Sequence, residues 1–312
     1  MSARIVSGWR AVLPRGRRPV VTIGVFDGVH RAHQRLIRTA VRLARRAAVP
    51  SIAITFHPDP QVVLQPHRFS PQLMPLEDRL RHLADLGLDW IWVIPFTRAF
   101  ARLSAERFVE RVLLGRLTAS CLIVGDGFLF GRGRSGTMDT LRQAGKCAGM
   151  RVVAVGTIRR VGGPVSSSRI RALIGAGRLS DARQLLGRPP SLSGRVVRGA
   201  GRGHRLGVPT ANFHPRGQVL PPPGVYAVRV RLARGSAPRG GVMNVGVRPT
   251  FGGGPLTCET HLPGFSGTLR GRHISVDLLA RLRGERRFRS PAALIRQIRL
   301  DLARARRLTS SR

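Results

Sequence analysis

Short apolar runs alternate with amphipathic stretches along the first half of the chain. Five apolar runs, rich in β-branched residues, predict strands at 19–25, 52–56, 91–94, 119–124 and 151–155. The stretches between them carry apolar residues three or four positions apart and predict helices at 33–48, 75–87, 104–115 and about 137–148. Alternating strands and helices are typical of a parallel, doubly wound α/β sheet. The ligand site of such a sheet is expected beyond the carboxyl ends of its strands.

The pattern changes near residue 188, where two consecutive prolines mark a linker. Beyond the linker, runs with strand character follow one another between turns rich in glycine and proline, at 194–198, 225–232, 241–245, 256–262 and 273–280. This succession is typical of a small antiparallel β-barrel. A terminal helix is expected after Ser290, because apolar residues recur at every fourth position from Leu294. We therefore predict two domains, 1–187 and 188–312.

The chain carries 54 basic and 15 acidic residues, a net charge of +39, and every basic residue except Lys146 is an arginine. Both predicted domains share the excess: 1–187 holds 30 basic and 11 acidic residues, and 188–312 holds 24 and 4. Such a charge favours phosphate-rich partners, either nucleotides or nucleic acid bound non-specifically through the basic surface. An arginine-biased composition with a solvated surface is the simpler explanation, because no nucleic-acid motif accompanies the charge.

Several classes of protein are disfavoured by what the sequence lacks. The aromatic-rich run at 90–96 is far shorter than the roughly 20 apolar residues of a membrane span, and no early stretch has the length of a signal peptide. Cys121, Cys147 and Cys258 lie far apart without CxxC spacing, which argues against a disulfide framework and a conventional zinc ribbon. We expect a cytoplasmic protein without a membrane partner.

The junction after the first strand carries candidate phosphate chemistry. There the sequence Phe26-Asp27-Gly28-Val29-His30-Arg31-Ala32-His33 leads into the first helix. A helix N-terminus offers unpaired N–H groups to phosphates, and two histidines three positions apart can donate hydrogen bonds as charge builds up. Taken alone, such a pair is more typical of a loop or a helix cap.

A second segment strengthens the interpretation. Ser166, Ser167 and Ser168 stand at a predicted helix start, and Arg171 follows one turn later. Three hydroxyls and a cation in this arrangement suit a triphosphate. An ordinary serine N-cap explains the serines equally well when they are considered alone.

Four segments together resemble the HxGH nucleotidylyltransferases, and more closely the N-terminal half of the prokaryotic bifunctional riboflavin kinase/FAD synthetases: 24–34, 55–60, 124–136 and 165–171. The resemblance implies a domain that adenylylates FMN with ATP, assisted by Mg²⁺, and releases pyrophosphate. It implies two catalytic residues, His30 and His33. For ATP it implies Gly24, Phe26, Asp27, Ser167, Ser168 and Arg171. For the flavin it implies Asp126 and Phe128.

This chain departs from that family pattern at Ser168, which keeps the hydroxyl of the usual threonine, and more markedly at two other positions. Ala32 stands where the HxGH motif has glycine, and a methyl group there can impede the approach of the backbone to the nucleotide. Gly127 stands where the family usually has an acidic residue or asparagine. Both changes bear on the rate of adenylyl transfer.

The C-terminal half has its own glycine-rich, basic segment at 199–212. Such a loop can wrap a phosphate, although a plain hairpin turn has the same composition. Its end is more distinctive, because Thr210 and Asn212 place a hydroxyl and an amide oxygen on one face of an extended segment. Both are suitable oxygen ligands for Mg²⁺.

This segment, with 224–226, 241–251, 259–262 and the terminal helix, resembles the riboflavin kinase family. That family folds as a six-stranded barrel and phosphorylates the ribityl hydroxyl of riboflavin. The resemblance implies Glu259 as the catalytic base, where a surface strand residue is the plainer alternative. It implies Gly201, Gly203 and Thr210 for ATP, Thr210 and Asn212 for Mg²⁺, and Asn244 and Arg248 for the flavin. The chain departs from the family pattern at Ala200, Thr268 and Arg270.

Together the two resemblances predict a transferase with riboflavin kinase and FMN adenylyltransferase activities. It would convert riboflavin to FMN and FMN to FAD, with Mg²⁺ and ATP at both steps. Two alternatives stay open at this stage. One is an enzyme that retains only the kinase activity, and the other is a degenerate paralogue that binds flavin, nucleotide or nucleic acid without turnover. The sequence leaves the oligomeric state and the natural flavin open.

Overall fold

The computed structural model describes residues 3–14, 16–68, 70–199, 207–232, 236–247, 256–286 and 288–310. The chain divides into two compact units. The first comprises Met1–Ser70 and Leu76–Ser166, and the second comprises Pro71–Pro75 and Ser167–Arg312.

The first unit is built on a parallel sheet with strand order β1-β4-β3-β2-β5-β6. The strands are β1 (Arg4–Ser7), β2 (Val20–Ile23), β3 (Ser51–His57), β4 (Trp90–Pro95), β5 (Cys121–Gly125) and β6 (Arg151–Val155). The doubly wound α/β sheet predicted from the sequence is therefore confirmed. The edge strand β1 was not predicted, because its four residues are mostly exposed and carry no periodic apolar signal.

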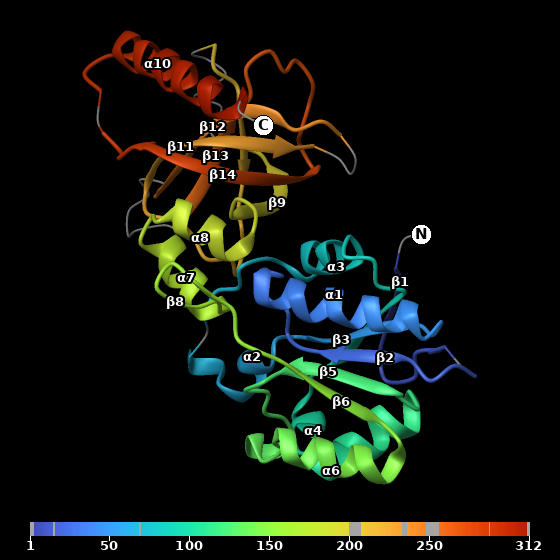
Figure 1. The fold of residues 1–312 in the computed structure, drawn as a ribbon. Helices are drawn as coiled ribbons and strands as arrows, with labels where there is room; N and C mark the ends of the chain where they lie inside the picture. Colours follow the sequence, from blue (N-terminus) through green and yellow to red (C-terminus); the bar gives the residue numbers. More distant parts are fainter. Residues whose placement is uncertain are drawn as a thin grey trace. The chain divides into compact units, whose positions relative to one another are not determined.

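Helices cover both faces of this sheet, with α1 and α3 on one face and α4 and α6 on the other (Figure 1). The longer helices of the unit are α1 (Arg31–Arg46), α3 (Leu76–Ala84) and α6 (Met138–Ala148), and the short ones are α2 (Pro60–Leu64), α4 (Arg98–Ala101) and α5 (Ala105–Phe108). Single turns of 3₁₀ helix lie at η1 (Pro66–Arg68) and η3 (Arg132–Arg134), and a small hairpin joins β7 (Arg159–Arg160) to β8 (Gly163–Pro164). The predicted helix at 104–115 is divided, since α5 continues as the π-helical segment η2 (Val109–Arg116).

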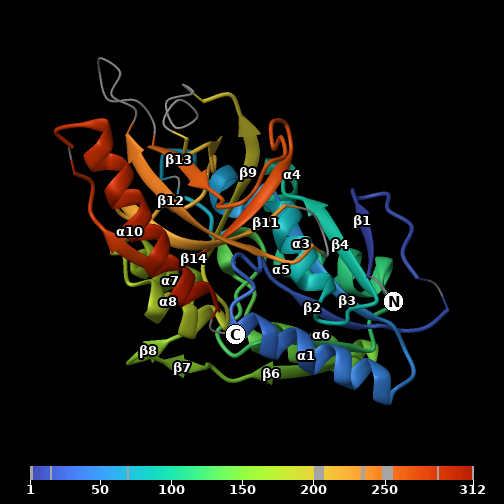
Figure 2. The ribbon, with the colours of Figure 1, turned by 90° about the horizontal axis from the view of Figure 1, so that it is seen from above.

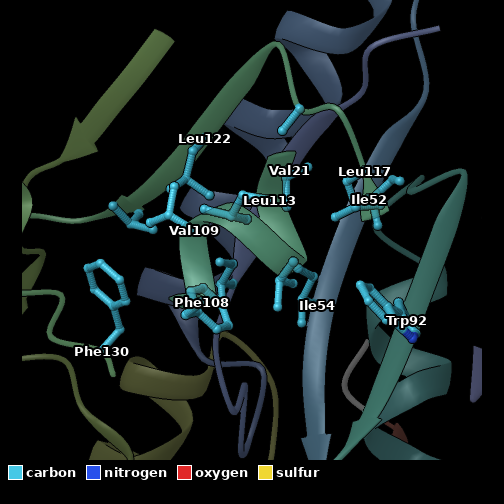
Figure 3. Packing of buried hydrophobic residues seen from close by; sticks show 14 of the residues in the cluster. Val21, Ile52, Ile54, Trp92, Phe108, Val109, Leu113, Leu117, Leu122 and Phe130 are labelled. Atoms are coloured by element: carbon cyan, nitrogen blue, oxygen red, sulfur yellow. The ribbon is translucent and has the colours of Figure 1, made fainter. Parts of the chain in front are cut away.

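The larger core of the unit lies between the sheet and α5, η2 and α6. Figure 3 shows Ile52, Ile54 and Trp92 of the sheet packed with Phe108 and Leu113. These side chains are almost entirely removed from solvent. On the opposite face, Ala40 and Ala44 in the C-terminal half of α1 pack with Val20 and Cys121 at the starts of β2 and β5.

The second unit is a closed antiparallel barrel with strand order β10-β13-β12-β11-β14-β9. The strands are β9 (Ser191–Val197), β10 (Thr210–Phe213), β11 (Gly224–Arg231), β12 (Arg239–Val247), β13 (Leu256–His261) and β14 (His273–Arg283). The predicted barrel is confirmed, with β10 as a strand that the apolar pattern did not reveal. The terminal helix α10 (Pro291–Ser310) packs against β11, β12 and β14 (Figure 2).

Two further helices and one short segment belong to the barrel unit. α7 (Ser167–Gly175) packs on α8 (Leu179–Leu186), and α8 packs on β14. Gln72 of the segment Pro71–Pro75 exchanges backbone hydrogen bonds with Gly217 and Val219. The predicted boundary between 187 and 188 stays a prediction.

Candidate active sites

The loop between β2 and α1 is a tight turn held in uncommon backbone conformations. Phe26, Gly28 and Val29 have φ angles of 55°, 80° and 39°. The left-handed region is costly for Phe26 and above all for the β-branched Val29, and such strain concentrates at functional sites. Gly24 is required for a different reason, because a Cβ built there would lie 2.9 Å from the ring of Phe26.

His30 and His33 come together at the start of α1. His30 is the N-cap of the helix, and its Nδ1 accepts a hydrogen bond from the backbone N–H of His33 at 3.4 Å. The two imidazole rings stack with centroids 3.5 Å apart. The rings of Phe26 and His33 form a T-shaped pair with centroids 5.2 Å apart. The helix-cap role, which was the plainer alternative, is therefore confirmed for His30. The Nδ1 of His33 is buried and has no hydrogen-bond partner among the described residues.

Burial lowers the pKa of His33 well below its usual value, and the neighbouring His30 and the guanidinium of Arg79 lower it further. His33 is therefore neutral near pH 7. A neutral imidazole retains one N–H that can donate to a phosphate oxygen. Such a neutral donor can stabilise negative charge that develops on a phosphate oxygen without carrying a permanent positive charge.

An apolar cavity of about 620 Å³ lies beside this loop, at the carboxyl ends of β2 and β3. Most of its lining is aliphatic and aromatic, from Ile23, Val25, Phe56, Leu64, Phe96, Phe100, Leu103, Phe108, Phe128, Leu129 and Phe130. The lining also includes Gly24, which has no side chain, and the charged residues Asp59 and Arg134. A flat, mostly apolar ring system is the kind of ligand that such a lining favours. The predicted flavin residue Phe128 lies in this wall.

Asp126, the other residue predicted for flavin in this unit, does not line the cavity. Its carboxylate accepts hydrogen bonds from the Thr157 hydroxyl at 3.1 Å and from the backbone N–H groups of Thr157 and Gly127. It thereby holds the loop after β5, and its role toward a ligand stays a prediction. A Cβ added at Gly127 would meet nothing within 4 Å, so the family's larger side chain has room there.

The serine segment lies at the start of α7, in the barrel unit. Ser167 and Arg171 are half-buried, and Ser168 is exposed. Whether these side chains reach the triphosphate of a nucleotide bound beside His33 stays a prediction, as do the ATP contacts of Asp27. Asp27 itself is buried within residues 26–33, the turn that carries His30 and His33 and is called the histidine loop below.

In the barrel, three of the predicted residues form one row across neighbouring strands. Asn212 of β10 pairs with Glu259 of β13, and Glu259 pairs with Asn244 of β12. Directly paired residues point to the same side of a sheet. Their chain neighbours Phe213, Cys258 and Met243 or Val245 fill the interior, so this row lies on the outer face of the barrel.

Asn212 and Thr210 present oxygen atoms that fit a hard cation. The Asn212 Nδ2 donates to the Thr210 hydroxyl at 3.4 Å, as their shared face predicted. The Asn212 Oδ1 is buried and has no hydrogen-bond partner among the described residues. Gly199 permits this arrangement, since a Cβ there would run into the Asn212 amide.

These oxygens fit Mg²⁺, which takes oxygen ligands and keeps several from water or substrate phosphates. No group of three or more His, Cys, Asp or Glu side chains that could hold a metal occurs among the described residues. Gly201, Gly203, Arg248 and the departure at Ala200 lie outside the described residues. Thr268 and Arg270 are exposed in the turn before β14.

Sequence reasoning missed one buried charge. Arg79 of α3 is 2% exposed and donates to the carbonyl oxygens of Val25 at 2.5 Å and Phe56 at 3.2 Å. Its position could have revealed it: Leu76, Leu80 and Leu83 surround it at helical spacing, so the arginine stands on the apolar face of the helix.

Family models match both units. The FAD synthetase model matches residues 14–169, and the riboflavin kinase model matches residues 186–309. A bifunctional riboflavin kinase/FMN adenylyltransferase of Escherichia coli strain K12 is 39% identical over 287 residues, covering 92% of this chain and 91% of the relative. The chain belongs to the bifunctional riboflavin kinase/FMN adenylyltransferase family. The Pseudomonas fluorescens member is 38% identical and covers 98% of both chains.

A solved structure of the same overall fold is described as a macrolide-efflux protein from Streptococcus pneumoniae. It has a TM-score of 0.84 and 29% identity, and the similarity covers 94% of this chain and 95% of that one. In the present family member, no helix within the described ranges combines the length and apolar character needed to cross a bilayer. The two family-model matches confirm the domain content predicted from the sequence, one FAD synthetase and one riboflavin kinase.

Proposed function

We propose that each unit of this family member carries one step of FAD synthesis, with Mg²⁺–ATP as the co-substrate at both. The barrel phosphorylates riboflavin to FMN. The N-terminal unit transfers the adenylyl group of a second ATP to the FMN phosphate and releases pyrophosphate. Both steps use cytoplasmic ATP and soluble flavin, and neither needs a membrane.

The adenylyl transfer is supported by the position of the apolar cavity next to the histidine loop. Gly24 and Val25 line the cavity and lead directly into the turn that carries His30 and His33. A flavin ring in the cavity would direct its phosphate toward the two imidazoles. His33 then donates its N–H to a phosphate oxygen and stabilises the charge that grows as the phosphoanhydride bond breaks, with no covalent intermediate.

The kinase step is supported by the row of Asn212, Glu259 and Asn244 on the barrel. Glu259 accepts the proton of the ribityl hydroxyl as the γ-phosphoryl group arrives. Thr210 and Asn212 hold the magnesium ion, which neutralises phosphate charge when it is bound. Asn244 lies beside Glu259 in register and orients the flavin substrate.

A chromatographic assay tests both steps at once. Purified protein is incubated with riboflavin, ATP and Mg²⁺, and separately with FMN, ATP and Mg²⁺, and the products are resolved. FMN and FAD from the first mixture and FAD from the second are expected. FMN as the only product would show that the departures at Ala32 or Gly127 disable the first unit. If folded protein forms neither product, the proposal is contradicted, and binding of flavin or nucleotide without turnover becomes the favoured alternative.

A further inference from the structure

The buried arginine of α3 connects the two parts of the adenylyl-transfer site. The guanidinium of Arg79 hydrogen-bonds the carbonyl oxygen of Val25, two residues after β2, and that of Phe56 near the end of β3. The Val25 carbonyl also accepts from the Thr55 hydroxyl at 3.0 Å. Because Val25 and Phe56 both line the apolar cavity, Arg79 fixes two of its walls from behind.

The same guanidinium interacts electrostatically with two carboxylates, Asp27 and Asp59. Burial lowers the pKa of Arg79, while Asp27 and Asp59 act in the opposite direction and favour its charged form. Asp27 belongs to the histidine loop, and Asp59 lines the cavity and caps α2 through the Gln61 N–H. Both carboxylates are themselves buried.

The imidazoles that face Arg79 complete its electrostatic surroundings. Its positive charge lowers the pKa of His33 in the loop and of His57 at the end of β3, in each case after the larger effect of burial. Two carboxylates and two imidazoles, from the histidine loop and from residues 57–59, thus interact electrostatically with one guanidinium. A hydrocarbon side chain at this apolar-face position would fill the space without linking these groups.

We propose that Arg79 is a positioning residue for adenylyl transfer, because it ties the histidine loop to the walls of the flavin cavity and keeps the two in register. It does not touch the reacting atoms. The planar guanidinium holds two carbonyl groups in a fixed geometry, which the compact, rotatable ammonium of lysine reproduces only in part. Alignment of this kind affects the rate of a group transfer more strongly than the affinity for substrate.

The proposal rests on the proposed adenylyl transfer, so the full chain is first assayed for FAD formation from FMN. Three variants are then compared: Arg79→Met, Arg79→Lys and the matched control Arg81→Met. Arg81 lies on the same helix, is partly exposed and pairs with Asp78, so its replacement removes the same charge without touching the site. FMN formation from riboflavin, which depends on the barrel, serves as an internal control for each preparation.

We expect Arg79→Met to lower kcat for FAD formation by about 100-fold while KM for FMN changes less than about threefold, since a small misplacement suffices for such a loss. Arg79→Lys should recover part of kcat, and Arg81→Met should match the wild type. FMN formation should be unchanged in all three. The pKa of His33, followed by NMR titration, should rise in Arg79→Met and stay close to the wild-type value in Arg79→Lys.

Two outcomes would overturn the proposal. One is a folded Arg79→Met or Arg79→Lys protein whose kcat for FAD formation equals that of the wild type. The other is a parallel loss of FAD and FMN formation, which would indicate general destabilisation. If Arg79→Met does not fold, Arg79→Lys carries the test through its kcat and KM. If the wild type itself makes no FAD, the proposed function fails, whereas the linkage is still tested by the His33 titration and by FMN binding measured through flavin fluorescence.

Discussion

His30 and His33 stack with their ring planes 17° from parallel, and the backbone N–H of His33 donates a hydrogen bond to the His30 Nδ1. One histidine therefore completes the helix start, and the other is held in a fixed orientation by it. The two histidines therefore differ as targets for mutagenesis. Replacement of His30 affects both the helix cap and the site. Replacement of His33 removes an imidazole whose Nδ1 makes no hydrogen bond within the described chain.

The first prediction concerns His33→Ala. Loss of a donor that stabilises developing phosphate charge is expected to lower FAD formation from FMN by about 10²–10³-fold. FMN formation from riboflavin should persist, because the barrel carries that step. Separate assays of the two products measure this difference. An unchanged FAD yield would remove His33 from the chemistry.

The second prediction follows from the lowered pKa of His33. The folded protein binds a proton at this site less readily than the unfolded chain does, so unfolding is favoured as His33 protonates in the unfolded state. The stability that this difference contributes is complete above the ordinary histidine pKa of about 6.5 and is lost as the pH falls toward the lower folded value. Urea unfolding of wild type and His33→Gln at about pH 7.5 and about pH 5.5 tests it. The wild type should lose more stability between the two conditions, and equal losses would contradict the assignment.

Much of this fold can be predicted from local sequence patterns. Buried parallel strands appear as short, continuous apolar runs, and amphipathic helices place apolar residues three or four positions apart. β1 and β10 escaped prediction for a physical reason. β1 is a short edge strand with mostly exposed side chains. β10 is only four residues long, so the alternation of Thr210 and Asn212 with Ala211 and Phe213 is too short to stand out as a strand signal.

The candidate sites were predictable only where a residue belongs to a contiguous motif. His30 and His33 lie in one turn, and the partnership of Thr210 with Asn212 follows from strand geometry. The Arg79 contacts with Val25 and Phe56 join residues 54 and 23 positions apart, and such long-range pairings appear only once the chain has folded. The family resemblance supplied Glu259, which its strand pattern alone does not distinguish from a surface residue.

The third prediction concerns Glu259→Gln, which keeps the shape of the side chain and removes its basicity. FMN formation is expected to fall by about 10²–10⁴-fold, the usual contribution of a positioned general base. FAD formation from supplied FMN should be unaffected, because the histidine loop lies in the other unit. Loss of both activities in a folded variant would contradict the assignment of the two steps to two sites.

The fourth prediction uses the space beside Asn212. In Gly199→Ala the new Cβ would collide with the Asn212 amide, whose buried Oδ1 is the proposed magnesium ligand. The side chain must turn away, so the apparent Mg²⁺ concentration needed for half-maximal FMN formation should rise by about tenfold, roughly the effect of disturbing a metal ligand through its neighbour. Gly284→Ala is the matched control in the same unit, because its Cβ would meet only the Arg281 side chain at 3.8 Å. The measurement is a magnesium titration of FMN formation for both variants. A higher half-maximal Mg²⁺ concentration in Gly199→Ala alone supports Asn212 as a ligand, and identical titrations for the two variants would exclude Asn212 as a ligand.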